Sequence, residues 1–180
     1  MGVVGNKNIL RLLISKGANV NARAGQGQTP LFLAESAGMA KILIDAGADV
    51  KAPAGADQLT PLMIIASQSA PAEGAIFRPD STRPNDIAQE LLERGADVNA
   101  KSKEGVTALM IAAAHNNPPM IGLLIDAGAD INAKNDQGKT AQDVAKLNDN
   151  AEAAQAIFVL GTAKSASDVP TPPANGSTSQ

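Results

Sequence analysis

The chain has 180 residues, of which 44% are hydrophobic, and a formal net charge of −3. This length is enough for one domain with its own core, and the modest acidic charge excludes the strongly basic surface of most nucleic-acid-binding domains. Because the chain has no cysteine, it cannot form disulfides or use thiolate chemistry. No apolar run approaches the roughly 20 residues of a membrane-spanning helix, so we expect no membrane span.

The first residues, MGVVGN, do not match a targeting signal. Asn6 stands where an N-myristoylation site has Ser or Thr. The charged, apolar and small-residue order of a secretion signal is absent as well. The sequence leaves two compartments open: the cytoplasm, or a bacterial periplasm if an export signal has been removed. The alanine-rich, cysteine-free composition is typical of a bacterial style of protein.

Residues 5–16 have aliphatic side chains at helical spacing and are followed by GANVNA, the first of four related segments. The others are GADVKA at Gly47, GADVNA at Gly95 and GADINA at Gly128, and each of them also follows an aliphatic stretch. Glycine tolerates the left-handed conformation in which many helices end. We therefore expect a helix to end before each of these glycines.

A second marker, Thr followed by Pro or Ala, lies 12 or 13 residues after each of those glycines, at Thr29, Thr60, Thr107 and Thr140. A threonine hydroxyl can cap a helix, and proline fits the first helical position. A short helix is therefore predicted to begin at each threonine. The segments between Gly and Thr, such as NAKSKEGVT, are polar and contain glycine, as a tight projecting turn requires.

This order of short helix, loop, second helix and projecting finger resembles the ankyrin repeat family, whose unit runs G-x-T-P-L-H-x-A-A and later G-A-D-V-N-A. The resemblance covers residues 5–160 and implies an all-α solenoid of stacked helix-loop-helix units with projecting β-hairpin-like fingers. One such pair cannot bury its apolar face alone, so the units must stack. The expected ankyrin repeat domain covers 1–161, with a partial repeat at 5–27, repeats at 28–57, 58–105 and 106–138, and a C-terminal capping repeat at 139–161.

Departures from the family pattern predict local differences. Phe32, Met63 and Met110 replace the family's histidine, so apolar packing must stand in for its hydrogen bond to threonine. Gln58 replaces the glycine of the other fingers, in a finger that is one residue longer, so we expect a different turn there. From Thr29 to the next such glycine is 18 residues, against 21 from Thr107, which predicts a shortened second helix in that repeat.

Two segments are predicted to lie outside the regular stack. The repeat that begins at Thr60 contains a proline-bearing insertion at 71–84, which we expect to protrude as a loop. Residues 162–180 are rich in Pro, Ser and Thr and are predicted to be a disordered tail. At the other end, only MGVV precedes the first helix, so Ile9, Leu12 and Leu13 are expected to lack a covering helix.

The residues available for catalysis are few. His115 is the only histidine, so a Ser/His/Asp triad would have to use it, and a zinc site would need mostly carboxylates. A surface position on the stack is the simpler interpretation of His115. The polar group at Asn148, Asp149, Asn150 and Glu152 lacks the spacing and glycine of a calcium loop. We therefore predict no enzyme activity, no metal site and no cofactor.

The family resemblance implies a protein-binding role for the finger tips and the exposed side of each first helix, which together line a concave face. On this chain the positions concerned are Arg23, Gln26, Gln28, Ser36, Asp57, Leu59, Ser67, Gln68, Lys101, Lys103, Glu104, Val106, His115, Lys134, Asp136, Gln137 and Lys139. Five of them are basic and three are acidic, which favours a partner with an acidic surface. The alternative is that the lysines only keep the fingers soluble.

A non-enzymatic protein-protein interaction module that acts as a monomer is the function we expect. The alternative is an inhibitor or immunity-type protein that blocks a partner enzyme with the 71–84 insertion. That segment contains Phe77, Arg78 and Arg83, and aromatic residues with arginine are enriched at the energetic centres of interfaces. The insertion could equally pack against the neighbouring helices.

Overall fold

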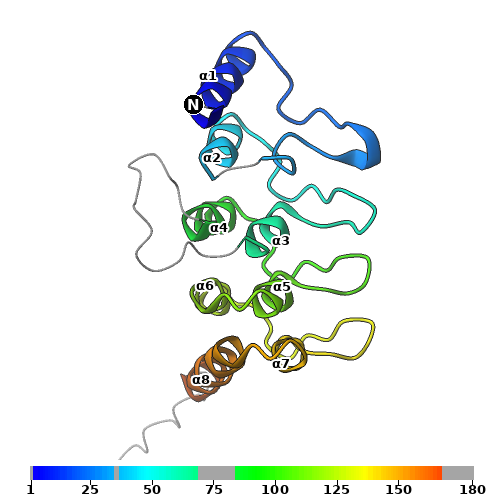
Figure 1. Ribbon diagram of the computed structural model, residues 1–180, viewed down its shortest axis with the longest axis vertical. Helices are drawn as coiled ribbons and strands as arrows, with labels where there is room; N and C mark the ends of the chain where they lie inside the picture. The colour runs from blue at the N-terminus through cyan, green and yellow to red at the C-terminus, as the bar shows by residue number, and fades with distance from the viewer. Residues whose placement is uncertain (1, 35–36, 69–83, 168–180) are drawn as a thin grey trace, which may run out of the picture.

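The protein is a stack of helix pairs with fingers projecting from one side (Figure 1). The computed structural model describes residues 2–34, 37–68 and 84–167. Its described residues form one 3₁₀ turn, η1 (Gly25–Gly27), and the α-helices α1 (Gly2–Ser15), α2 (Ala37–Asp45), α3 (Pro61–Ala66), α4 (Pro84–Glu93), α5 (Ala108–Ala114), α6 (Pro118–Asp126), α7 (Ala141–Leu147) and α8 (Ala151–Ser167). Helices α3, α5 and α7 form a column beside the fingers, and α1, α2, α4, α6 and α8 form the other column.

Threonine begins the helices of the column beside the fingers, as the sequence predicts. The hydroxyl oxygens of Thr60, Thr107 and Thr140 accept hydrogen bonds from backbone N–H groups three residues later, at 3.3–3.4 Å. Pro61 occupies the first position of α3. These side chains satisfy donors that have no partner within the helix.

The predicted shortening after Thr29 is real, but the sequence analysis assigned it to the wrong helix. Residues 30–33 form a hydrogen-bonded turn instead of an α-helix, in which the Thr29 hydroxyl accepts from Phe32 N–H at 3.3 Å. The second helix, α2, keeps nine residues, the same number as α6. It begins eight residues after Thr29, whereas α6 begins eleven residues after Thr107. The turn missing from this repeat therefore comes from its first helix.

The second helices end at the predicted glycines. Gly17, Gly47, Gly95 and Gly128 have φ angles of 84–95°, in the left-handed region. The corresponding glycine after α8 is Gly161, but α8 continues through it to Ser167. The prediction that disorder begins at residue 162 is therefore wrong for 162–167, because Thr162 and Ala163 replace the Ala-Asp that follows the glycine elsewhere. Residues 168–180 lie outside the described part of the chain.

Short connections join the helices of the last two pairs. Residues 115–117 link α5 to α6 and residues 148–150 link α7 to α8. Asn116 and Asp149 adopt left-handed φ angles of 48° and 56° in these connections. Such short links force the two helices of each pair to run antiparallel.

An asparagine follows each left-handed residue and binds the preceding helix pair or its own. The buried Asn117 caps α6 by accepting from Met120 N–H at 3.1 Å, and it donates to the carbonyl of Gln68 at 3.2 Å. The side chain of Asn150 donates to the carbonyls of Ala113 and Ala114 at 2.9 Å. The polar group near residue 149 is therefore a helix connection, as the sequence analysis preferred.

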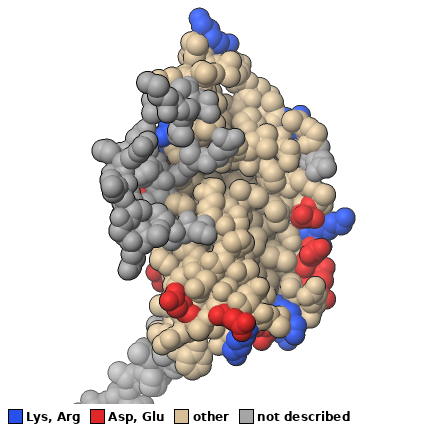
Figure 2. All heavy atoms as spheres, viewed as in Figure 1, with Lys and Arg blue, Asp and Glu red and all other residues tan. Residues whose placement is uncertain are grey.

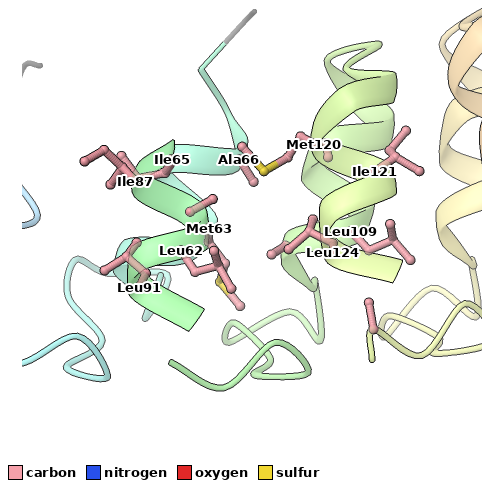
Figure 3. Packing of buried hydrophobic residues seen from close by; sticks show 14 of the residues in the cluster. Leu62, Met63, Ile65, Ala66, Ile87, Leu91, Leu109, Met120, Ile121 and Leu124 are labelled. Carbon is pink, nitrogen blue, oxygen red and sulfur yellow. The ribbon is translucent and has the colours of Figure 1, made fainter. Parts of the chain in front are cut away.

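The core is aliphatic and thin, and it continues from pair to pair (Figure 3). Ile87 and Leu91 of α4 lie against α3, and Met120 and Leu124 of α6 lie against α5; all four are 0% exposed. Met63 and Met110, at the position of the family's histidine, are buried as expected. The Met63 sulfur also accepts a weak hydrogen bond from Thr60 N–H at 3.4 Å, so it partly replaces the imidazole.

Candidate functional site

The four fingers, residues 24–28, 54–59, 102–106 and 135–139, are tight turns closed by backbone hydrogen bonds. The closing bonds run from the N–H of the first residue to the carbonyl of the last, at 2.9–3.1 Å. Only the second finger has a β-bridge, Ala54 to Leu59, among the described residues, so the predicted hairpins are not confirmed. Gln58 has a φ of 55°, so it takes the left-handed conformation that Gly27, Gly105 and Gly138 adopt without strain.

Neighbouring fingers are joined at their tips. Lys103 N–H donates to the Asp57 carbonyl at 2.9 Å, and Asp136 N–H donates to the Glu104 carbonyl at 3.0 Å. The Lys101 ammonium also reaches the Lys134 carbonyl at 3.0 Å. Fingers two, three and four therefore form one row that is connected by hydrogen bonds.

Close contact between fingers three and four requires a glycine. A Cβ atom on Gly105 would lie 2.8 Å from the Asp136 carboxylate and 3.1 Å from the backbone of Asn135 and Asp136. Any side chain there would push the fourth finger away. Gly105 therefore has a packing role as well as a conformational one.

The finger bases are joined by asparagine bridges, in which one asparagine side chain bonds the turn of the next unit. Asn21 donates to the Gly47 carbonyl at 3.1 Å and accepts from Asp49 N–H at 2.7 Å. Asn99 repeats this arrangement with Gly128 and Asp130, at 3.1 and 2.8 Å. Lys51 stands at the equivalent position of the second finger, and its side chain lies next to Gly95.

Where that bridge is missing, charged residues join α2 to α4. We call Lys41, Asp45, Glu90 and Arg94 the ionic junction. The Lys41 ammonium lies 2.8 Å from Glu90, and the Arg94 guanidinium lies 3.0 Å from Asp45 and 3.1 Å from Glu90. The hydrogen bond to Glu90 raises the pKa of Lys41. The sequence analysis missed this group because its partners are 49 residues apart.

Most of the predicted binding residues that the structure describes reach solvent. Charged side chains of both signs gather along the side of the fingers (Figure 2). The exposed members of the predicted set are Arg23, Asp57, Lys101, Lys103, Glu104, His115, Lys134, Asp136, Gln137 and Lys139, and the half-buried members are Gln28, Leu59, Ser67, Gln68 and Val106. Ser36, Phe77, Arg78, Arg83 and the side chain of Gln26 lie outside the described residues, as does the 71–84 insertion except Pro84, which begins α4.

Some of these residues already use their polar groups within the fold. The Ser67 hydroxyl donates to the Ile64 carbonyl at 2.7 Å. His115 ends α5, and its Nδ1 lies 2.9 Å from the Ile111 carbonyl. Ser67 and His115 are therefore weaker candidates for contact with a partner than the finger lysines.

The described part of the chain offers little for catalysis. It contains no group of three or more His, Cys, Asp or Glu side chains placed to hold a metal ion. Asp143 has a lowered pKa, caused first by the hydrogen bond from Thr140 N–H and then by the Thr140 hydroxyl. This carboxylate therefore closes the cap of α7. None of the described helices is long and apolar enough to cross a bilayer.

A cleft of about 590 Å³ lies at the C-terminal end of the stack, between the base of the fourth finger, the start of α7 and the end of α8. Ile131 and Asn132 line one side, and Phe158 and Thr162 line another. Asn132 occupies the position of Asn21 and Asn99, but α8 runs on where the other units have a turn. The cleft therefore results from the missing turn.

Comparison with known families agrees with the repeat pattern. Models described as "Ankyrin repeats (3 copies)", "Ankyrin repeat" and "Ankyrin repeats (many copies)" match residues 2–76, 57–103 and 91–145. A curated relative, Alpha-latrocrustotoxin-Lt1a of Latrodectus tredecimguttatus, is 32% identical over 114 residues. That similarity covers 61% of this chain and 7% of the relative, so this chain spans a small fraction of the toxin's length.

Proposed function

The chain belongs to the ankyrin repeat family, whose members are generally non-enzymatic interaction modules, and we propose that it binds a partner protein through its finger row and the adjoining helix column. The observation that carries this proposal is the hydrogen-bonded row of fingers two to four. A row held at its tips and bases presents its side chains in a fixed arrangement, which lowers the entropy that binding would cost.

The charge of this row suggests the chemistry of the partner. Lys101, Lys103, Lys134 and Lys139 project from the third and fourth fingers, against the carboxylates of Glu104 and Asp136. A basic excess on a chain with a net charge of −3 favours an acidic partner surface through electrostatic steering. We therefore propose that the partner's contact surface is acidic.

A charge reversal with a matched control tests this function. Lys103→Glu changes the charge at a finger tip, and Arg11→Glu makes the same change on the exposed side of α1, away from the fingers. Proteins captured from the source organism by the wild-type chain are identified and their affinities measured for both variants. At low salt we expect Lys103→Glu to weaken binding by about threefold or more, with the difference shrinking as salt rises.

The control decides how a negative result is interpreted. A partner that binds wild type, Lys103→Glu and Arg11→Glu equally does not use the finger row as proposed. If the lysines only keep the fingers soluble, Lys103→Glu lowers solubility and leaves the affinity unchanged.

A further inference from the structure

The outer face of α1 is the largest group of exposed apolar side chains on one described helix. Ile9, Leu12 and Leu13 are 58%, 58% and 53% exposed. They follow the i, i+3, i+4 spacing by which a helix packs against another helix. Leu10 and Ile14, on the opposite side, pack against the core next to α2.

The internal repeats show what covers these positions. Leu13 stands four residues before its terminal glycine, as do Leu91 and Leu124, and Ile9 stands eight residues before it, as do Ile87 and Met120. All four counterparts are 0% exposed. In each case the first helix of the same pair, α3 or α5, packs against them, and the short link between α5 and α6 fixes that packing as antiparallel.

We propose that the α1 helices of two copies of this chain pair antiparallel across a two-fold axis, so that each α1 takes the place of the missing first helix of the other. The packed stripe is Ile9, Leu12 and Leu13, which carries no charge. Lys16 lies at one end of the stripe, so antiparallel pairing puts the two Lys16 side chains at opposite ends. A two-fold interface is self-complementary and closes at two copies.

The C-terminal end of the stack fits α1 less well. On α8 the large exposed apolar side chains are the adjacent Phe158 and Val159. Phe158 stands three residues before Gly161, as the buried Ile125 stands before Gly128. That position does not face the first helix of its own pair, which is what Ile9 and Leu13 lack. Pairing through α1 leaves the fingers of both copies free, so this inference is independent of the proposed function.

Sedimentation equilibrium on the full chain tests the pairing. Leu13→Glu places a charge in the proposed interface, and Leu33→Glu is the matched control because Leu33 is also 53% exposed. We expect a dimer for the wild type and for Leu33→Glu at about 100 µM protein. For Leu13→Glu we expect a dissociation constant raised at least about tenfold, with an unchanged circular dichroism spectrum.

A second measurement uses the absence of cysteine in the chain. A single Leu12→Cys should form disulfide-linked dimers quickly, and Leu33→Cys should not. A wild type that stays monomeric, or a dimer that Phe158→Glu dissolves and Leu13→Glu does not, overturns the proposal. Capture of a different protein by the α1 face with no self-association overturns it as well.

Discussion

The ionic junction and the Asn99 bridge do the same work in neighbouring parts of the stack by different chemistry. Between α2 and α4, four charged side chains that are 17–51% exposed make the contacts. Between the third and fourth finger bases, one neutral asparagine makes two hydrogen bonds to backbone groups. Exposed ion pairs contribute little and are screened by salt, whereas neutral bonds are not screened. We therefore expect the stack to be weakest, and most sensitive to conditions, at the ionic junction.

The largest effect should come from the hydrogen-bonded side of this comparison, at Asn117. Asn117→Ala removes the α6 cap and leaves the carbonyl of Gln68 without its donor in a buried site. We expect a loss of about 2–3 kcal/mol in the free energy of unfolding, measured by urea denaturation. Asn148→Ala, at an exposed residue of the next connection, is the control and should cost about 1 kcal/mol or less.

Installing the missing bridge should strengthen the weaker junction. Lys51→Asn places an amide where Asn21 and Asn99 stand, within reach of the Gly95 carbonyl and Asp97 N–H. We expect a gain of about 1–2 kcal/mol, since each hydrogen bond contributes about 0.5–1.5 kcal/mol. The reverse change, Asn99→Lys, should lose a similar amount in the same assay. If both changes are neutral, the asparagine bridges do not stabilise the stack.

Breaking the ionic junction should give a smaller loss that depends on salt. Arg94→Gln removes the contacts of the guanidinium to Asp45, Glu90 and the Ile44 carbonyl. We expect a cost of about 0.5–1 kcal/mol at low ionic strength that shrinks in high salt. Asn99→Ala, measured at the same salt concentrations, should show a constant loss. A salt-independent effect of Arg94→Gln would mean that its packing matters more than its charge.

The smallest effect is that of alkaline pH on Lys41. Its pKa is raised above the ordinary 10.5 by Glu90, so Lys41 holds its proton more tightly when folded. This contribution to stability is complete below pH 10.5 and is lost as pH rises through the higher pKa of the folded state. Unfolding measured between pH 9 and 12 should show a slight decline that Lys41→Met removes. A Lys41→Met variant with the same decline would assign it to other groups.

The parts of the fold that were predictable from the sequence are those set by neighbouring residues. The threonine caps and the glycine turns depend on a few adjacent positions, so Thr107 and Gly128 identify their elements directly. The location of the shortened helix was not predictable, because spacing gives the length lost between Thr29 and Gly47 but not which helix loses it. Gly161 was misread as a helix end because the residues after it, rather than the glycine itself, decide whether the chain turns.

For the candidate site, the predictable part was which residues reach solvent on the fingers. The bonds between fingers could not be predicted, because the Lys103 N–H and the Asp57 carbonyl meet only when the units stack. The same holds for the ionic junction, in which Lys41 and Glu90 lie far apart in the chain. The pattern of charged residues gave no sign that these two differ from other surface residues.

The connection lengths also bear on the order in which the protein folds. The pairs α5–α6 and α7–α8 are closed by links of three residues each, whereas 17 residues separate α3 from α4. Short links cost less chain entropy to close and favour rapid folding. We therefore expect the folding nucleus to lie in the C-terminal half, which the ribosome releases last, so the N-terminal units should acquire their stable structure only after synthesis is nearly complete.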